Sequence, residues 1–219
     1  DVIALSDTTA GVLICDVMGH GMRSALVTAI LRGLVNEWRQ FAAEPGEFLT
    51  RINTSLLDAL QACGTPIFAT AFYFVLDTGS GRLRYASAGH PNPLVLRRQQ
   101  RQVEVLRGNG AALGLFRETE LATRETVLAA GDSVLLFTDG LYEATDPAGD
   151  PFGQERLLAA VRERLDLPAA QLLAELIAAV REFTLAGGFD DDVCLLTAEL
   201  VRLTGRTNGN VPPHKNVLQ

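Results

Sequence analysis

The sequence VLICDVMGHG, residues 12–21, is an apolar run that ends in an aspartate and a glycine-rich turn. Its first four residues predict a buried strand, and Asp16 follows them directly. Asp139 and Asp191 stand beside two other apolar runs, residues 134–138 and 193–196. A carboxylate at the end of a buried strand is costly without a partner. Three such positions in one chain predict a shared partner, most simply hard divalent cations such as Mg²⁺ or Mn²⁺.

Each aspartate also has an ordinary structural interpretation. Asp16 precedes a turn, and Asp139-Gly140 is a common turn dipeptide. The triplet at residues 190–192 is typical of a solvated loop or of a strand end. Their joint position beside buried strands favours metal binding over these alternatives, although sequence spacing alone does not show that they meet.

The bulk composition is that of a single globular domain. The chain has 219 residues, of which 47% are hydrophobic and 21% charged. A net charge of −7 argues against a nucleic-acid-binding protein, which would usually carry a basic surface. The cysteines Cys15, Cys63 and Cys194 form no Cys-x-x-Cys pattern, which argues against zinc and favours reduced thiols in the cytoplasm.

The ends of the chain are informative in a different way. No apolar run approaches the roughly 18 residues of a membrane span, and Asp1 stands inside an apparent strand rather than a signal peptide. We therefore expect a fragment, with one domain over residues 1–203. Residues 204–219 are rich in Asn, Gly and Pro and predict a flexible tail.

The hydrophobic periodicity predicts a layered α+β domain, because pairs of helices alternate with β-hairpins. On the first predicted helix the apolar stripe consists of Leu26, Ile30, Leu34 and Trp38, which are spaced by four, and Val27 and Leu31 widen it. Helices are predicted at residues 22–41, 47–62, 154–165 and 169–185. Strands are predicted at residues 2–5, 11–17, 68–77, 82–87, 94–98, 103–106, 125–128, 134–138 and 193–203.

Two histidines lie in glycine-containing segments. His20 is flanked by Gly19 and Gly21 at a strand-to-helix junction, where backbone amides favour an anion. Proton donation to a leaving group, contact with phosphate, and helix capping are all open roles for His20. His90 is better interpreted as a structural loop histidine than as a catalytic group.

Taken together, these residues resemble the PPM (type 2C) metal-dependent protein phosphatases, specifically their bacterial SpoIIE-like branch. The matching stretches are DVMGHGMRSAL (16–26), SAGHPNPL (87–94), LGL (113–115), LFTDGLYEA (136–144) and DDV (191–193). They occur in the family's order and extend over nearly the whole chain. The resemblance implies a four-layer α-β-β-α sandwich.

The same resemblance implies a site for two Mn²⁺ or Mg²⁺ ions between the sheets. Asp16 would bridge both ions, and the backbone carbonyl of Val17 would bind one of them. Asp139 and Asp191 would complete the protein ligands, with Asp192 beside them.

The function implied is hydrolysis of phosphoserine or phosphothreonine on a protein, such as an anti-sigma-factor antagonist. The resemblance further implies an upstream sensor or receiver domain, control through the helices at residues 22–62, and a possible homodimer. A PPM-like module that is catalytically weak and acts by binding a regulatory partner is the alternative.

The chain departs from the family pattern in three places. The family's upstream Gly-Asp pair, which supplies a metal ligand, has no counterpart, and Asp1 corresponds to the next aspartate of that segment. Cys194 replaces the usual threonine after the acidic pair. The phosphate-binding arginine of eukaryotic relatives has no evident counterpart either. The weaker set of ligands is what keeps the binding-module alternative open.

Overall fold

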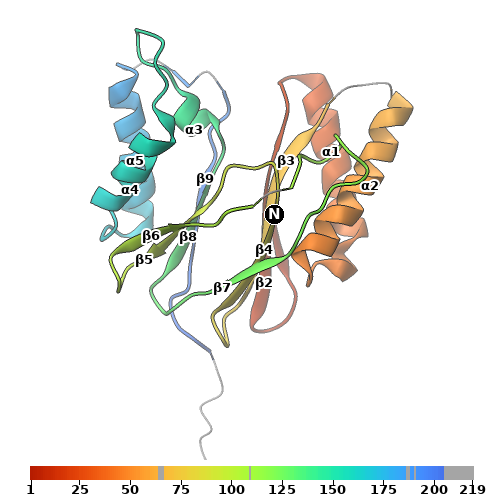
Figure 1. Cartoon of the computed structure of the whole chain (residues 1–219), viewed down its shortest axis with the longest axis horizontal. Helices are drawn as coiled ribbons and strands as arrows, with labels where there is room; N and C mark the ends of the chain where they lie inside the picture. Colours follow the sequence, from red (N-terminus) through yellow and green to blue (C-terminus); the bar gives the residue numbers. More distant parts are fainter. Residues whose placement is uncertain (64–66, 109, 186–187, 190, 205–219) are drawn as a thin grey trace, which may run out of the picture.

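Two antiparallel sheets lie face to face and are covered by helices on their outer sides (Figure 1). The computed structural model describes residues 1–63, 67–108, 110–185, 188–189 and 191–204. The predicted tail lies outside these residues except for Thr204, so the domain boundary at residue 203 stays a prediction. Among the described residues, no helix is long and apolar enough to cross a membrane.

The first sheet has the strand order β1-β2-β3-β4-β7. Its strands are β1 (Val2–Ala4), β2 (Thr9–Val17), β3 (Ala69–Asp77), β4 (Arg82–Ala88) and β7 (Arg124–Val127). The second sheet has the order β6-β5-β8-β9. Its strands are β5 (Leu94–Arg97), β6 (Gln102–Val105), β8 (Ser133–Phe137) and β9 (Leu195–Glu199).

The helices form the two outer layers (Figure 1). Helices α1 (Met22–Glu37) and α2 (Pro45–Cys63), joined through a short 3₁₀ turn at Arg39–Phe41, cover the first sheet. Helices α3 (Gly140–Glu143), α4 (Gly153–Glu163) and α5 (Ala169–Phe183) cover the second. This is the predicted α-β-β-α order.

Three separate hydrophobic cores follow from the period-two alternation of the strands. In β3, Ala71 and Tyr73 face the helices, whereas Phe72 and Phe74 face the other sheet. Tyr73 donates a hydrogen bond to the Ala42 carbonyl, at 2.8 Å. A Cβ at Gly11 would lie 1.9 Å from the Tyr73 hydroxyl oxygen, so only glycine lets that ring pass across β2.

The structure corrects four details of the predicted elements. Leu26 is 60% exposed, because the buried face of α1 is formed by the predicted Val27 and Leu31 together with Val35. Helix α2 begins at Pro45, two residues before its predicted start, since proline is well suited to the first helical turn. The last strand is shorter than predicted, and the short helix α3 was not predicted.

Candidate functional site

Asp16 lies near the end of β2 and continues the face of the strand that points toward the second sheet. Val12 and Ile14, two and four residues earlier, belong to the core between the sheets. The chain then turns through Gly19 and Gly21, which have φ values of 80° and 87°, in the left-handed region that favours glycine. This sharp turn sends the chain directly into α1 and leaves Asp16 at the open end of the core.

Asp139 reaches the same region from the second sheet. It directly follows Thr138 at the end of β8 and caps α3, where its Oδ1 accepts a hydrogen bond from the Gly140 backbone N–H at 3.1 Å. The backbone carbonyl of Asp139 accepts from the N–H groups of Tyr142 and Glu143. The short helix therefore fixes the backbone that carries this carboxylate.

Thr138 attaches the third acidic segment to β8. Its buried hydroxyl donates to the Asp192 carbonyl at 3.0 Å and accepts from the Cys194 N–H at 2.9 Å. A Cβ at Gly140 would lie 2.8 Å from the Asp192 carbonyl oxygen, so the absence of a side chain allows the close approach. Asp191 and Asp192 are thus held beside Asp139.

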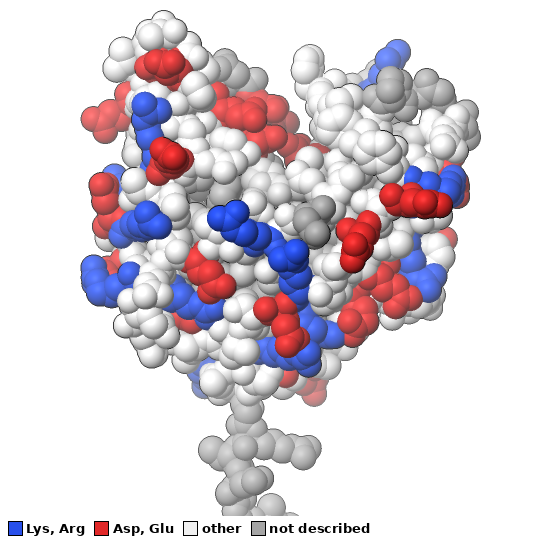
Figure 2. Space-filling model, viewed as in Figure 1, with Lys and Arg blue, Asp and Glu red and all other residues white. Residues whose placement is uncertain are grey.

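The electrostatics show that these carboxylates share one environment. The pKa of Asp16 rises from 3.8 to about 6, mainly through burial and then through the negative charges of Asp139 and Asp191. A smaller contribution comes from Asp192, while a hydrogen bond from the Val17 backbone acts in the opposite direction. Acidic side chains gather along the hollow between the two lobes of the molecule (Figure 2).

Glu143 adds a carboxylate that the sequence reasoning missed. Its pKa is raised by burial and by the charges of Asp139 and Asp191, so it faces the same acidic region. The signal was present in the sequence, because Glu143 lies four residues after Asp139 and a helical turn brings such positions to one side. The turn predicted at Asp139-Gly140 hid this relation.

The set of donors fits hard divalent cations better than zinc, since it consists of carboxylates in a region of accumulated negative charge. Within the described residues, however, no group of three or more His, Cys, Asp or Glu side chains is arranged closely enough to hold a metal ion. The fold brings the predicted ligands into one region without placing them at coordinating distances. Their roles as ligands remain a prediction.

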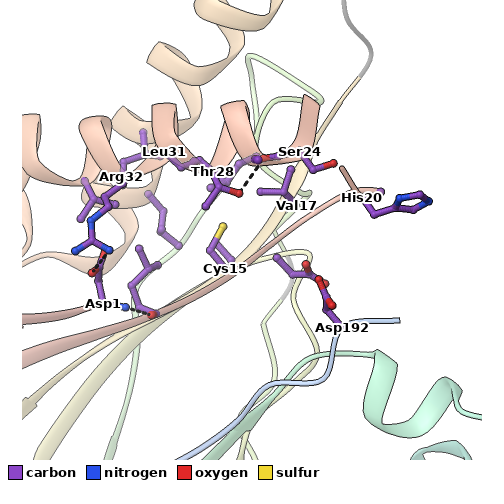
Figure 3. Close-up of a pocket in the computed structure, with 18 of the residues that line it drawn as sticks. Asp1, Cys15, Val17, His20, Ser24, Thr28, Leu31, Arg32 and Asp192 are labelled. Carbon is purple, nitrogen blue, oxygen red and sulfur yellow. Dashed lines mark hydrogen bonds and ion pairs between the residues drawn. The ribbon is translucent and has the colours of Figure 1, made fainter. Parts of the chain in front are cut away.

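A pocket of about 500 Å³ extends from this region beneath α1. Asp16, Val17 and Asp192 line one end, and Asp1 lies at the other end beside Arg32, with 3.5 Å between their charged groups (Figure 3). The position aligned with a family aspartate is therefore occupied by an ion-paired residue.

Two other residues of the pocket differ sharply in their surroundings. His20 stands at the rim and its ring points away from the pocket (Figure 3). The thiol of Cys15 points into the pocket, where burial and the neighbouring Asp16 raise its pKa to about 12. Cys15 is therefore an uncharged wall residue at neutral pH.

Residues 6–201 match the family model described as Stage II sporulation protein E (SpoIIE). The phosphoserine phosphatase RsbP of Bacillus subtilis is 25% identical over 191 residues, which cover 87% of this chain and 45% of RsbP. The enzyme class of this relative, phosphoserine phosphatase, is the class predicted from the sequence. The chain spans between 32% and 45% of the length of three curated relatives that it matches.

Solved structures agree on the fold. The SiaA PP2C domain of Pseudomonas aeruginosa superposes with a TM-score of 0.77 at 22% identity, covering 91% of this chain and 78% of that one. The catalytic domain of the serine/threonine phosphatase PstP, in complex with two manganese ions, has a TM-score of 0.61 at 17% identity, covering 91% and 90%. These similarities confirm the predicted PPM fold.

Proposed function

Because the chain belongs to the SpoIIE family, we propose that it is a metal-dependent serine/threonine protein phosphatase. The observation that carries the proposal is that Asp16 near the end of β2 and Asp139 just after β8 lie at the same open end of the fold, with the Asp192 segment bonded to Thr138 beside them; the charges of Asp139 and Asp191 accordingly help to raise the pKa of Asp16. Carboxylates from two different sheets meet at one open end of the fold. Such a concentration of negative charge is what a site for hard cations requires.

We assign Mn²⁺ or Mg²⁺ to this region, as two ions. Asp16 would contact both, with the Val17 carbonyl, Asp139, Asp191 and Asp192 as further ligands. When bound, such ions lower the pKa of a coordinated water and neutralise the charge of phosphate oxygens. PstP carries two manganese ions in the same fold, which supports the assignment.

The remaining residues of the site supply position and a proton. Thr138 and Gly140 keep the Asp191-Asp192 segment against β8. Gly19 and Gly21 allow the turn that brings His20 to the rim. From there His20 is available to donate a proton to the departing serine or threonine oxygen, or to contact the phosphate. Its outward orientation requires a rotation of the ring before it acts.

The substrate we propose is a phosphoserine or phosphothreonine on a bacterial signalling protein, with an anti-sigma-factor antagonist as the leading example. The position of the site at the open end of the fold suits a side chain presented on a protein surface (Figure 2). A sensor or receiver domain in the full-length protein would supply regulation, and a homodimer is part of the same proposal.

The test is the substitution Asp139→Asn in the full-length protein, with Asp166→Asn as the matched control. Asp166 is an exposed aspartate that pairs with Arg101 away from the site. Calorimetry should show that Asp139→Asn binds Mn²⁺ much more weakly, and hydrolysis of a phosphopeptide should fall by at least about 100-fold. The control should match the wild type in both measurements.

Two outcomes would contradict the proposal. Unchanged Mn²⁺ affinity in Asp139→Asn would remove this residue from the site. Failure of the wild type to bind Mn²⁺ or to release phosphate, while it still binds a phosphoprotein partner, would favour the alternative of a regulatory binding module.

A further inference from the structure

His90 occupies the segment that crosses from one sheet to the other. It lies between β4 of the first sheet and β5 of the second, and only 5% of its surface is exposed. The preceding residue, Gly89, donates its N–H to the Gly110 carbonyl at 2.8 Å and has a φ of 70°. A Cβ at Gly89 would lie 3.0 Å from the Ala112 backbone nitrogen. The crossing segment is therefore tightly held, and the ring has little freedom.

One ring nitrogen of His90 contacts the first sheet at the level of the acidic site. Nδ1 lies 2.9 Å from Oγ1 of Thr70. Thr70 is the direct cross-strand partner of Asp16 in the antiparallel register of β2 and β3. The imidazole thus holds the strand position that neighbours the central carboxylate.

The other ring nitrogen is directed into the protein without a settled partner. Nε2 is buried and has no hydrogen-bond partner among the described residues. A hydrogen-bonding interaction with the Phe137 backbone nevertheless raises the pKa of the ring, so the Phe137 carbonyl lies close to Nε2 even though the geometry falls short of a full hydrogen bond. Phe137 ends β8 and precedes Asp139 by two residues.

The His90 ring carries no charge at neutral pH, so only one of its two nitrogens can donate a hydrogen bond. Burial lowers the pKa of His90 to about 4, and the Phe137 backbone offsets only part of this effect. A neutral imidazole has one donor and one acceptor nitrogen. If Nδ1 accepts from the Thr70 hydroxyl, Nε2 carries the proton and seeks an acceptor on the second sheet. A buried donor left unpaired is unfavourable, and the Phe137 backbone at the end of β8 is the acceptor that acts on the ring.

We propose that His90 is a positioning residue that sets the distance between the two strands carrying Asp16 and Asp139. Nδ1 holds Thr70 opposite Asp16, and Nε2–H is directed to the Phe137 carbonyl at the end of β8. The inference rests on the proposed metal site. It gives a role to a histidine that is only 5% exposed and that contacts Thr70, the strand position opposite Asp16.

The experiment compares Mn²⁺ binding by calorimetry in the full-length wild type, His90→Phe and Thr70→Val. The phenylalanine keeps a ring in the cavity and removes both nitrogens, and the valine keeps the shape of the threonine. Loss of a residue that orients metal ligands typically costs 10–100-fold in affinity. We expect a loss in that range for His90→Phe, a smaller loss for Thr70→Val, and a double variant no worse than His90→Phe alone. Phe74→Leu, in the same inter-sheet core, is the control for repacking and should keep the wild-type affinity.

A measurement on the wild type keeps the test decisive where a variant does not fold. The ¹⁵N and ¹H resonances of the His90 Nε2–H group should shift when Mg²⁺ is added, because ions held between Asp16 and Asp139 would change the separation of Thr70 and Phe137, which the ring contacts. Wild-type Mn²⁺ affinity in a folded His90→Phe variant would overturn the inference, as would Nε2–H resonances unaffected by saturating Mg²⁺. If the wild type binds neither ion, the proposed function fails instead.

Discussion

Replacing Thr138 with valine removes one hydroxyl group and leaves the shape of the side chain nearly unchanged. That hydroxyl makes two hydrogen bonds to the segment carrying Asp191 and Asp192, at 3.0 and 2.9 Å. A hydrogen bond of this kind contributes about 0.5–1.5 kcal/mol net, so the pair is worth about 2 kcal/mol. Water can reach the freed backbone groups, because Asp192 and Cys194 are exposed residues, and this limits the loss.

The assay is urea unfolding in the presence of EDTA, followed by the fluorescence of Trp38, the only tryptophan. A loss of about 2 kcal/mol should lower the urea midpoint by roughly 1 M. Calorimetry should then show weaker Mn²⁺ binding as well, because the freed loop must be ordered again before Asp191 can act as a ligand.

Thr197→Val provides the matched control. Thr197 is half-buried in β9, and no hydrogen bond joins its side chain to another described residue. Thr138→Val and Thr197→Val with the same midpoint and the same Mn²⁺ affinity would refute the reasoning that Thr138 holds the acidic loop.

Four further outcomes are expected. Gly140→Ala should weaken Mn²⁺ binding measured by calorimetry, because the new Cβ would lie 2.8 Å from the Asp192 carbonyl oxygen and displace the segment that carries Asp192. An unchanged affinity would show that this segment can move without any effect on metal binding. EDTA should abolish phosphopeptide hydrolysis, and Mn²⁺ or Mg²⁺ rather than Zn²⁺ should restore it, whereas full turnover after exhaustive chelation would exclude the metal mechanism. The pKa of His90 is about 4 in the folded protein and about 6.5 in the unfolded chain, so acid favours the unfolded state. The unfolding free energy of the wild type should therefore fall by about 3 kcal/mol more than that of His90→Phe between pH 6.5 and pH 4. Parallel pH profiles of the two proteins would contradict this. Leu26→Glu, at a 60% exposed position of α1, should leave the fold intact and disrupt a homodimer seen by light scattering in the full-length protein; wild-type oligomeric state and activity would mean that the helix is scaffold only.

The sequence alone predicted the position of those strands and helices that are marked by a pattern within their own residues. Strands such as β2 and β3 were predicted within two residues, because alternation and turn residues mark them without reference to the rest of the chain. Nothing local says which strands share a sheet. The pairing of β5 with β8, and of β4 with β7, joins segments far apart in sequence and was not predicted; the resemblance to a known fold supplied only the order of the layers.

The candidate site was predictable in its carboxylates and not in its supporting residues. Asp16 and Asp139 stand out because a charge ending an apolar run demands an explanation. Thr138 and Thr70 carry no such signal, since a threonine in a strand is ordinary. Their importance comes from partners on other strands, and only the three-dimensional register shows them.

The exposed Leu26 illustrates a limit of periodicity. A spacing of four along α1 fits a stripe through Leu26 and Trp38 as well as one through Val27 and Leu31. The core at the first sheet buries Val27 and Leu31 and is contacted by Trp38 at its edge, while Leu26 is left outside, and this choice depends on how the helix is rotated about its axis. Sequence pattern alone leaves that rotation open.

The division of the acidic residues between two sheets has a consequence beyond turnover. Ions held by Asp16 on one sheet and Asp139 on the other would join the two halves of the fold, much as a crosslink does. Binding to the native state alone stabilises it by RT ln(1 + [M]/Kd), about 2.7 kcal/mol at a free-ion concentration of one hundred times Kd. A protein built this way would resist proteolysis when manganese or magnesium is plentiful and be degraded faster when it is scarce. The supply of metal would then set how long the molecule survives in the cell as well as how fast it works.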